Sequence, residues 1–172
     1  MDFTNKELDS ENFKGVNFTG ASFDNSRFIS CTFDNCNLSN VELKNSRLQN
    51  VAFKDCKLMG LDFSKCNKFL MSFNFENCSV SMCIFSNLEL QNTVFKDCQI
   101  FDCDFLNTNL TRASFENSDL KNSRIQHSNL SFTSFKDARN YNINPNENFL
   151  KKTKFSTPEV ISLLSAFDII LE

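Results

Sequence analysis

The stretch FDNSRFISCTFDNCNLSNVEL, residues 23–43, repeats one pattern every five residues. A large apolar side chain stands at the centre of each unit: Phe23, Phe28, Phe33, Leu38 and Leu43. An α-helix has a period of about 3.6 residues and an ordinary strand a period of about 2, so neither produces this repeat. The pattern therefore indicates a repeat architecture, in which each unit packs on its neighbours.

The same frame extends along most of the chain. It runs from Phe13 to Phe63, changes phase, and resumes from Phe75 to Phe135. Two residues before each centre the side chain is usually small, and two residues after it stands Asn, Asp or Gly in most units. Those last residue types tolerate tight or left-handed turns, so we expect a corner in every unit.

This pattern of a small residue, a Leu or Phe centre and a polar corner resembles the pentapeptide-repeat family over residues 3–138. The resemblance implies an all-β solenoid, a right-handed quadrilateral β-helix with one unit on each side and about twenty residues in each coil. We expect about six coils within residues 1–143. Residues 144–172 are then a connector, a C-terminal α-helix that caps the last coil, and a tail.

Stacking of the centres tests this coil length. Every fourth centre should fall in one column, and one such column reads Phe13, Phe33, Phe53, Phe75, Phe95, Phe115 and Phe135. A second column reads Phe28, Leu48, Leu70, Leu90, Leu110 and Leu130. Both columns require two extra residues in one irregular coil near 64–75, which we place within SKCNKFL at residues 64–70.

Charges give an independent test of the register. The residues that follow the phenylalanine column alternate in sign without exception: Lys14, Asp34, Lys54, Glu76, Lys96, Glu116 and Lys136. Stacked strands lie about 4.8 Å apart, so like charges in one column repel and opposite charges attract. The alternation favours the predicted register.

The eight cysteines also follow the frame. Seven lie two residues before a centre, and Cys66 would do so without the insertion. Cys98 and Cys103 then face the interior from adjacent sides, and we predict buried, reduced thiols that act as small apolar residues. The only histidine, His127, falls at an exposed corner, so no zinc site is expected.

Composition limits the function. The chain has 18 basic and 21 acidic residues, a net charge of −3, which gives no basic footprint for nucleic acid. It shows no apolar signal segment or membrane span, so we expect a cytoplasmic protein. No phosphate loop, metal motif or Ser/Cys–His pairing occurs. We therefore expect a non-catalytic protein without a cofactor.

Some outward positions break the polar pattern. Five apolar residues fall on two adjacent sides in the third to fifth coils: Met59, Met82, Ile84, Phe101 and Leu106. Three acidic residues line the second of these sides: Glu42, Asp62 and Asp104. An apolar cluster beside acidic groups is a candidate partner surface. Random scatter of apolar residues is the alternative interpretation.

The segment FSTPEVISLLSAF, residues 155–167, predicts a helix, with Ser156 and Glu159 as a capping box or, alternatively, Thr157 as the cap and Pro158 in the first turn. One apolar stripe, Val160, Leu163, Leu164 and Phe167, can cover the open end of the last coil. The tail residues Ile169, Ile170 and Leu171 then have nothing to bury them within one chain. A homodimer joined through this C-terminal segment would cover them.

Among pentapeptide-repeat proteins, the chain resembles bacterial members that bind type II topoisomerases, including quinolone-resistance and immunity proteins. The resemblance implies DNA mimicry, with DNA gyrase or topoisomerase IV as the partner, topoisomerase inhibition or protection, and dimerisation through the C-terminal segment. One feature differs: residues 1–143 carry 17 acidic and 15 basic residues, a net charge of only −2. A structural scaffold for an unrelated protein is therefore the alternative function.

Overall fold

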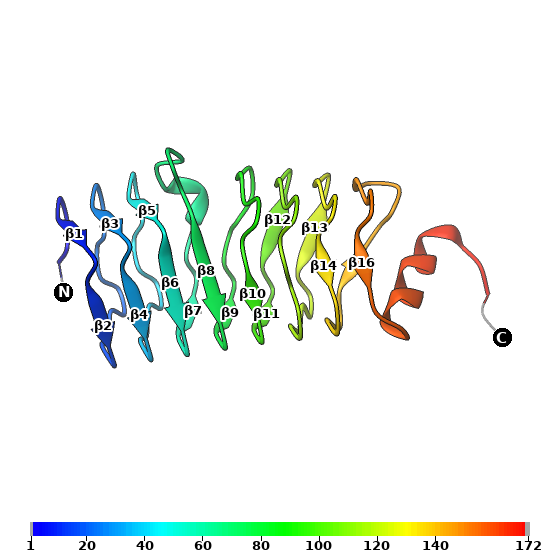
Figure 1. The fold of residues 1–172 in the computed structure, drawn as a ribbon, viewed down its shortest axis with the longest axis horizontal. Coiled ribbons are helices and arrows are strands. Elements are labelled where there is room, and N and C mark those ends of the chain that lie inside the picture. Colours follow the sequence, from blue (N-terminus) through cyan, green and yellow to red (C-terminus); the bar gives the residue numbers. More distant parts are fainter. Residues whose placement is uncertain (1, 171–172) are drawn as a thin grey trace.

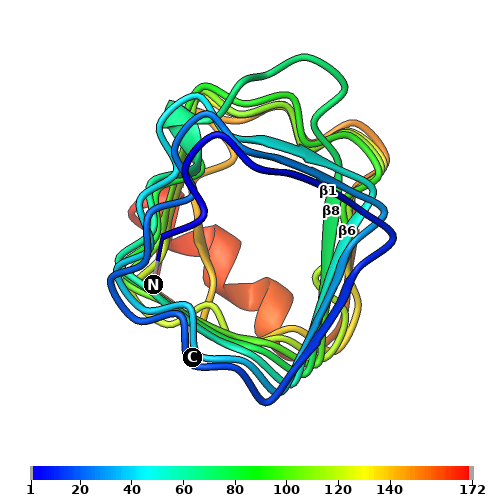
Figure 2. The same ribbon diagram turned by 90° about the vertical axis from the view of Figure 1, so that its left-hand side faces the viewer.

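The computed structural model describes residues 2–170 and shows an elongated rod (Figure 1). The chain forms a right-handed all-β solenoid of about seven turns, about one more than predicted. Viewed from its end, each turn has four sides that meet at corners (Figure 2). Parallel pairing joins each side to the same side of the next turn, so ladders of short strands run along the rod.

We number the four sides from the one that carries the phenylalanine column, in chain order. The first side contains β2 (Asn12–Lys14), β4 (Thr32–Asp34), β6 (Val51–Lys54), β8 (Phe73–Glu76), β10 (Phe95–Lys96), β14 (Ser134–Phe135) and β16 (Lys154–Phe155). The second side contains β7 (Lys57–Met59), β9 (Ser79–Ser81) and β11 (Gln99–Phe101).

The other two sides are less regular. The third side contains the 3-10 turn η1 (Phe63–Lys65), β12 (Asp104–Leu106), β13 (Arg124–Gln126) and β15 (Asn142–Ile143). The fourth side contains β1 (Glu7–Asp9), β3 (Arg27–Ile29) and β5 (Arg47–Gln49). Beyond the irregular coil this side continues as single β-bridges, which link Glu89 to Asn109, Asn109 to Asn129, and Asn129 to Phe149.

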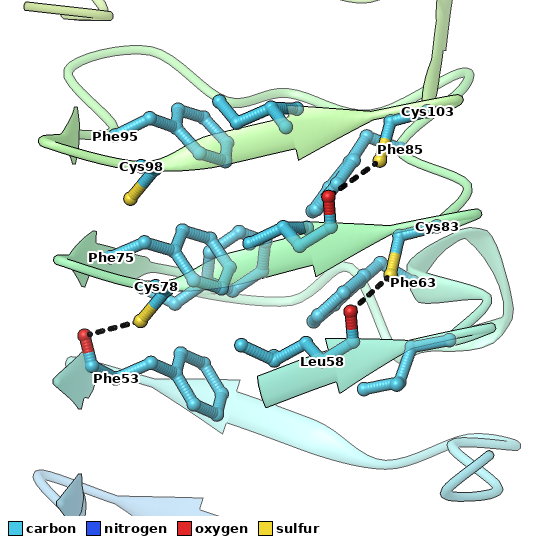
Figure 3. Packing of buried hydrophobic residues seen from close by; sticks show 14 of the residues in the cluster. Phe53, Leu58, Phe63, Phe75, Cys78, Cys83, Phe85, Phe95, Cys98 and Cys103 are labelled. Atoms are coloured by element: carbon cyan, nitrogen blue, oxygen red, sulfur yellow. Dashed lines mark hydrogen bonds between the residues drawn. The ribbon is translucent and has the colours of Figure 1, made fainter. Parts of the chain in front are cut away.

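The core is a stack of phenylalanine rings (Figure 3). Phe75, Phe95 and Phe115 are buried, and the centroid of the Phe95 ring lies 4.9 Å from each of the other two. The rings are nearly parallel, with interplanar angles of 11° and 2°. Rings on the third side meet this stack edge-on, as Phe85 meets Phe95 at 5.6 Å. The five-residue frame and its twenty-residue coil are confirmed.

The small inward residues do more than fill space, because they also carry hydrogen bonds between coils. Ser118 Oγ donates to the carbonyl oxygen of Phe95 at 2.9 Å and accepts from the backbone N–H of Cys98 at 3.0 Å. The Cys78 thiol donates to the Phe53 carbonyl at 3.4 Å (Figure 3). Ser, Thr and Cys side chains therefore bind backbone groups of the preceding coil, which an alanine side chain could not do.

The alternating charge column holds the predicted register. Lys54 pairs with Glu76 across β6 and β8, although the two side chains form no ion pair within the described residues. Lys14 Nζ lies 3.5 Å from Asp34 Oδ2, and Lys96 Nζ lies 3.7 Å from Glu76 Oε1. These exposed pairs stabilise the fold by only a few tenths of a kcal/mol each, so they specify register more than stability.

The irregular coil differs from the prediction in one residue. Leu70, predicted as a core centre, is 58% exposed and has a φ of 53°. The two extra residues lie after Cys66, and the loop 67–72 bows outwards on the fourth side (Figures 1 and 2). Phe73 takes the small-residue position opposite Val51 and is buried. Its ring packs on those of Phe63 and Phe75, with centroids 5.1 and 5.4 Å away.

The solenoid continues past the predicted boundary at residue 143. Phe155 in β16 pairs with Phe135 in β14, and their rings stack at 5.3 Å. The predicted end of the solenoid was wrong because the spacing between paired residues changes there. Ile143 pairs with Ile125, 18 residues earlier, and after the turn 144–148 Phe155 pairs with Phe135, 20 residues earlier. The stretch 144–155, predicted as a connector, instead completes the seventh turn.

The C-terminal helix η2 (Glu159–Phe167) is a 3-10 helix, not the predicted α-helix. It lies beyond the last turn and across the outline of the coils (Figures 1 and 2). The predicted capping box is absent from η2, because both side chains bind the solenoid instead. Ser156 Oγ accepts from the backbone N–H of Asp137 at 3.0 Å, and Glu159 Oε1 accepts from that of Asn140.

Candidate partner surface

Four of the five predicted apolar residues lie along one edge of the rod, the corner between the second and third sides. Met59 and Phe101 flank Ser81 in register on the second side. Met82 stands at the corner and is 56% exposed, and Ile84 follows on the third side. Leu106 is half-buried at the end of β12, and it lies at the opposite end of the third side, next to the corner at Asn107. The structure therefore brings four of the five residues together and places Leu106 apart from them.

The three predicted acidic residues share one column on the third side but differ in their partners. Asp104 accepts two hydrogen bonds from the guanidinium of Arg124, at 2.6 and 2.7 Å. Asp62 accepts from the backbone N–H of Ser64 at 3.1 Å, and its other oxygen lies 3.5 Å from Lys65 Nζ. Glu42 is exposed and forms no ion pair within the described residues. Most of the negative charge on this side is thus compensated.

A groove of about 660 Å³ opens beside this column, and sequence reasoning missed most of its lining. Its walls include Glu42 and Asp62 from the predicted set, and also Asp24, Lys44, Gly60 and Lys65. Gly60 has a φ of +73°, and a Cβ there would lie 2.6 Å from Asn40 Oδ1. The missed signal was this glycine, one of three in the chain, at a corner next to the acidic column.

The backbone at Met82 is strained. Met82 has a φ of 51°, in the left-handed region that glycine and asparagine tolerate and that other residues adopt at a cost. The neighbouring corners hold residues suited to it, Gly60 and Asp102. A large exposed methionine at this corner does not help the coil to fold. Its side chain projects into solvent at this corner, 56% exposed.

Two sequence models of one family match the chain: the pentapeptide repeat region at residues 6–81, and pentapeptide repeats in eight copies at residues 103–139. The chain belongs to the pentapeptide-repeat family. No curated protein sequence matches it significantly.

Solved structures of other pentapeptide-repeat proteins are similar to this one. A trypsin-treated QnrB1, described as a plasmid-mediated fluoroquinolone resistance protein, is 17% identical with a TM-score of 0.50, covering 99% of this chain and 93% of that one. HetL, described as involved in heterocyst differentiation regulation in the cyanobacterium Nostoc, is 12% identical with a TM-score of 0.48, covering 90% and 86%. At these identities the likeness extends to the fold alone.

All eight cysteines of this pentapeptide-repeat protein are buried and free, as the frame predicted. Cys36 and Cys56 stack one coil apart, with the backbone N–H of Cys36 3.4 Å from the Cys56 sulfur. Burial raises the pKa of the Cys66 thiol to about 12. Within residues 2–170, no three His, Cys, Asp or Glu side chains are placed to hold a metal ion. No helix in that range is long and apolar enough to span a membrane.

The predicted C-terminal contact residues fall into a half-buried group and an exposed group, because η2 is a 3-10 helix. In a 3-10 helix side chains three apart lie in line. Val160 and Leu163 are half-buried, and Leu163 packs against the core. Leu164 and Phe167, predicted in the same stripe, are 36% and 51% exposed. Three neighbours are also exposed, Ile161 at 49%, Ile169 at 52% and Ile170 at 90%, while Leu171 lies outside the described residues.

Proposed function

We propose that this pentapeptide-repeat protein is a non-catalytic, protein-binding solenoid that acts in the cytoplasm. The observation that carries the proposal is the corner at Met82, where a strained backbone presents an exposed apolar side chain beside a groove lined by Glu42 and Asp62. Exposed apolar groups rimmed by charged ones are typical of a protein interface. The eight free thiols suit the reducing cytoplasm.

The named partner that we propose is a type II topoisomerase, DNA gyrase or topoisomerase IV, protected from quinolones or toxins by DNA mimicry. The proposal is supported by the family and by the fold shared with QnrB1, described as a fluoroquinolone resistance protein. In a DNA mimic, the column with Glu42, Asp62 and Asp104 would stand in for phosphates. A supercoiling assay with and without a quinolone tests this role.

The second candidate is a scaffold for an unrelated protein. The bidentate contact between Arg124 and Asp104 favours it, because a paired carboxylate is a poor substitute for a phosphate. Lys65 near Asp62 acts in the same direction. A supercoiling assay in which this protein changes neither gyrase activity nor quinolone sensitivity would leave the scaffold as the remaining candidate.

The test common to both functions is capture of a partner from bacterial lysate. The variant Met82→Asn with Ile84→Ser should lose the captured protein, since it removes the apolar side chains and keeps the fold. Ile29→Ser is the matched control, because Ile29 is a half-buried outward residue of β3 on the fourth side. Equal loss in both variants, or none in either, would contradict a surface at this corner.

We also propose that η2 caps the last turn and that a homodimer forms through its outer face. Ser156 and Glu159 accept hydrogen bonds from corner N–H groups that a further coil would otherwise bind. The row Ile161, Leu164 and Phe167, with Ile170, remains exposed. An isologous contact would bury it.

Deleting residues 168–172 tests the dimer. We expect the full chain to be dimeric by light scattering and the truncated chain to be monomeric, because the deletion removes Ile169 and Ile170, which are 52% and 90% exposed. The circular dichroism of the coils should not change. A full-length chain that is monomeric at tens of micromolar would show that the exposed row has another use.

A further inference from the structure

The corner between the fourth and first sides carries large side chains in its last three coils. Arg112, Phe132 and Lys152 have φ values of 58°, 63° and 55°. In preceding coils the same corner holds Ser30, Asn50 and Asn92. The left-handed conformation costs most residues about 1–2 kcal/mol, which asparagine relieves by bonding locally. Three successive corners therefore hold residues that disfavour the left-handed conformation, and the folding of the coils does not explain these residues.

These three side chains form one stack. The guanidinium of Arg112 lies 5.4 Å from the centroid of the Phe132 ring, and Lys152 Nζ lies 5.8 Å from it. The ring therefore separates two cations that would otherwise repel each other, and cation–π attraction holds both in place. Phe132 remains 39% exposed, so part of the ring still faces solvent.

Further cationic and aromatic groups extend this stack across the last coil. Phe149 is 71% exposed, and Lys151 and Lys154 are also exposed. Among the residues that the structure describes, Arg112 and the three lysines form no ion pair. Phe149, at the other end of the fourth side, also borders a depression of about 230 Å³ whose lining includes Asn109, Asn129 and Glu89. We call this set the basic–aromatic corner: Arg112, Phe132, Phe149, Lys151, Lys152 and Lys154.

We propose that the basic–aromatic corner binds a short acidic segment of another protein, with an apolar side chain of that segment packed on Phe149. Four unpaired cations supply the charge complementarity. The corner spans three coils, roughly 10 Å at about 4.8 Å per coil. That length suits a few carboxylates of an extended peptide.

A nucleic acid fits this corner less well. A protein that binds a nucleic acid backbone needs a long basic face, because phosphates repeat along the whole strand. Glu89 lies at the far end of the fourth side and Glu116 at the far end of the first, and the chain as a whole has a net charge of −3. A continuous polyanion would therefore meet repulsion beyond these coils. The corner also lies diagonally across the rod from Met82, so this inference is independent of the proposed function.

Fluorescence anisotropy tests the inference on the full chain. The probes are a fluorescein-labelled peptide of glutamates with one phenylalanine, the same peptide with lysines in place of glutamates, and an oligothymidylate matched in charge to the first. We expect only the acidic peptide to bind strongly, and added salt to weaken it. An acidic peptide that fails to bind, or an oligothymidylate that binds more tightly, would overturn the proposal.

Matched variants locate the binding. Reversing Lys151, Lys152 and Lys154 to Glu should weaken the acidic peptide at least about tenfold, since each exposed charge contact contributes up to about 1 kcal/mol. The control reverses Lys44, Lys57 and Lys121, which lie on the second and third sides and change the net charge equally. Equal weakening by both triple variants would overturn the assignment to this corner.

The variant Phe132→Asn separates binding from folding. Asparagine suits the left-handed corner, so the urea midpoint should stay the same or rise, while the peptide affinity should fall several-fold because the two cations lose their spacer. Unchanged affinity together with a lower midpoint would show that the stack only stabilises the coils, and would contradict the proposal.

Discussion

Replacing Phe95 with alanine should remove about 4 kcal/mol from the free energy of unfolding. The side chain is fully buried, and its ring is stacked between Phe75 and Phe115 at 4.9 Å on each face. Phe85 and Phe105 meet its ring edge-on at 5.6 and 5.8 Å. Removal of a buried phenylalanine side chain typically costs about 3–5 kcal/mol, because it loses apolar burial and leaves a cavity.

The position of Phe95 places the loss in the upper half of that range. The rings above and below the cavity, Phe75 and Phe115, belong to the two neighbouring coils, and each contact between aromatic rings adds about 0.5–1.5 kcal/mol beyond burial. Rigid, hydrogen-bonded coils limit how far the walls can collapse. Phe13 begins the same column, is only half-buried and stacks on Phe33 alone within it. Phe13→Ala should therefore cost roughly half as much.

Urea unfolding followed by circular dichroism measures these losses, since the chain has no tryptophan. Phe101→Ala is the matched control, because Phe101 points outward from β11 and is only half-buried. We expect that variant to lose less than about 1 kcal/mol. If Phe95→Ala and Phe101→Ala lose equal stability, the division into inward and outward positions is refuted. A Phe13→Ala loss as large as that of Phe95→Ala would refute the role of stacking on both faces.

Three further predictions concern corners and thiols. Met82→Asn should raise the melting temperature by about 2–4 °C, because it relieves roughly 1 kcal/mol of backbone strain; a lower melting temperature would show that the methionine stabilises its corner. The cysteines should react slowly with a small thiol reagent in the folded chain and rapidly in urea, and fast reaction before unfolding would contradict their burial. Burial tends to raise the pKa of Asp119, but hydrogen bonds from Asn140 and Arg139 outweigh it and hold that pKa below its usual value. Its contribution is therefore present above about pH 4 and lost as the pH falls through the folded pKa, so Asp119→Asn should destabilise at neutral pH and lose its effect in acid.

The sequence predicted the solenoid because its interior and its corners repeat strictly. A centre such as Phe95 favours a large apolar residue and a corner such as Asn45 favours Asn, Asp or Gly, and twenty residues later the same requirement returns. The charge column then fixed the coil length. The apolar set around Met82 was predictable by the same counting, since an apolar residue at an outward position breaks the pattern.

The predictions were wrong where the number of residues per coil departs from twenty. Leu70 matches the column by spacing, but the outward loop and the bulky Phe73 exclude it from the core. The seventh turn was missed because a short corner and a long turn cancel between Ile143 and Phe155. The groove lining was missed because Asp24 and Lys44 follow the ordinary polar pattern. The insertion at 67–72 and the changed spacing at 143–155 alter the backbone path, and the five-residue pattern of side chains does not show where the backbone then runs.

The pairing of each coil only with its neighbours has a mechanical consequence. The hydrogen bonds between coils run along the rod, as from the backbone N–H of Phe95 to the carbonyl of Ser114 at 2.7 Å. Tension applied at the two ends pulls directly on these bonds, and the terminal coil, held on one face, opens first. Each detached coil releases about twenty residues, or roughly 70 Å of extended chain. A single molecule under load should therefore lengthen in nearly equal steps, and the coil with the loop 67–72 should give a step about two residues longer.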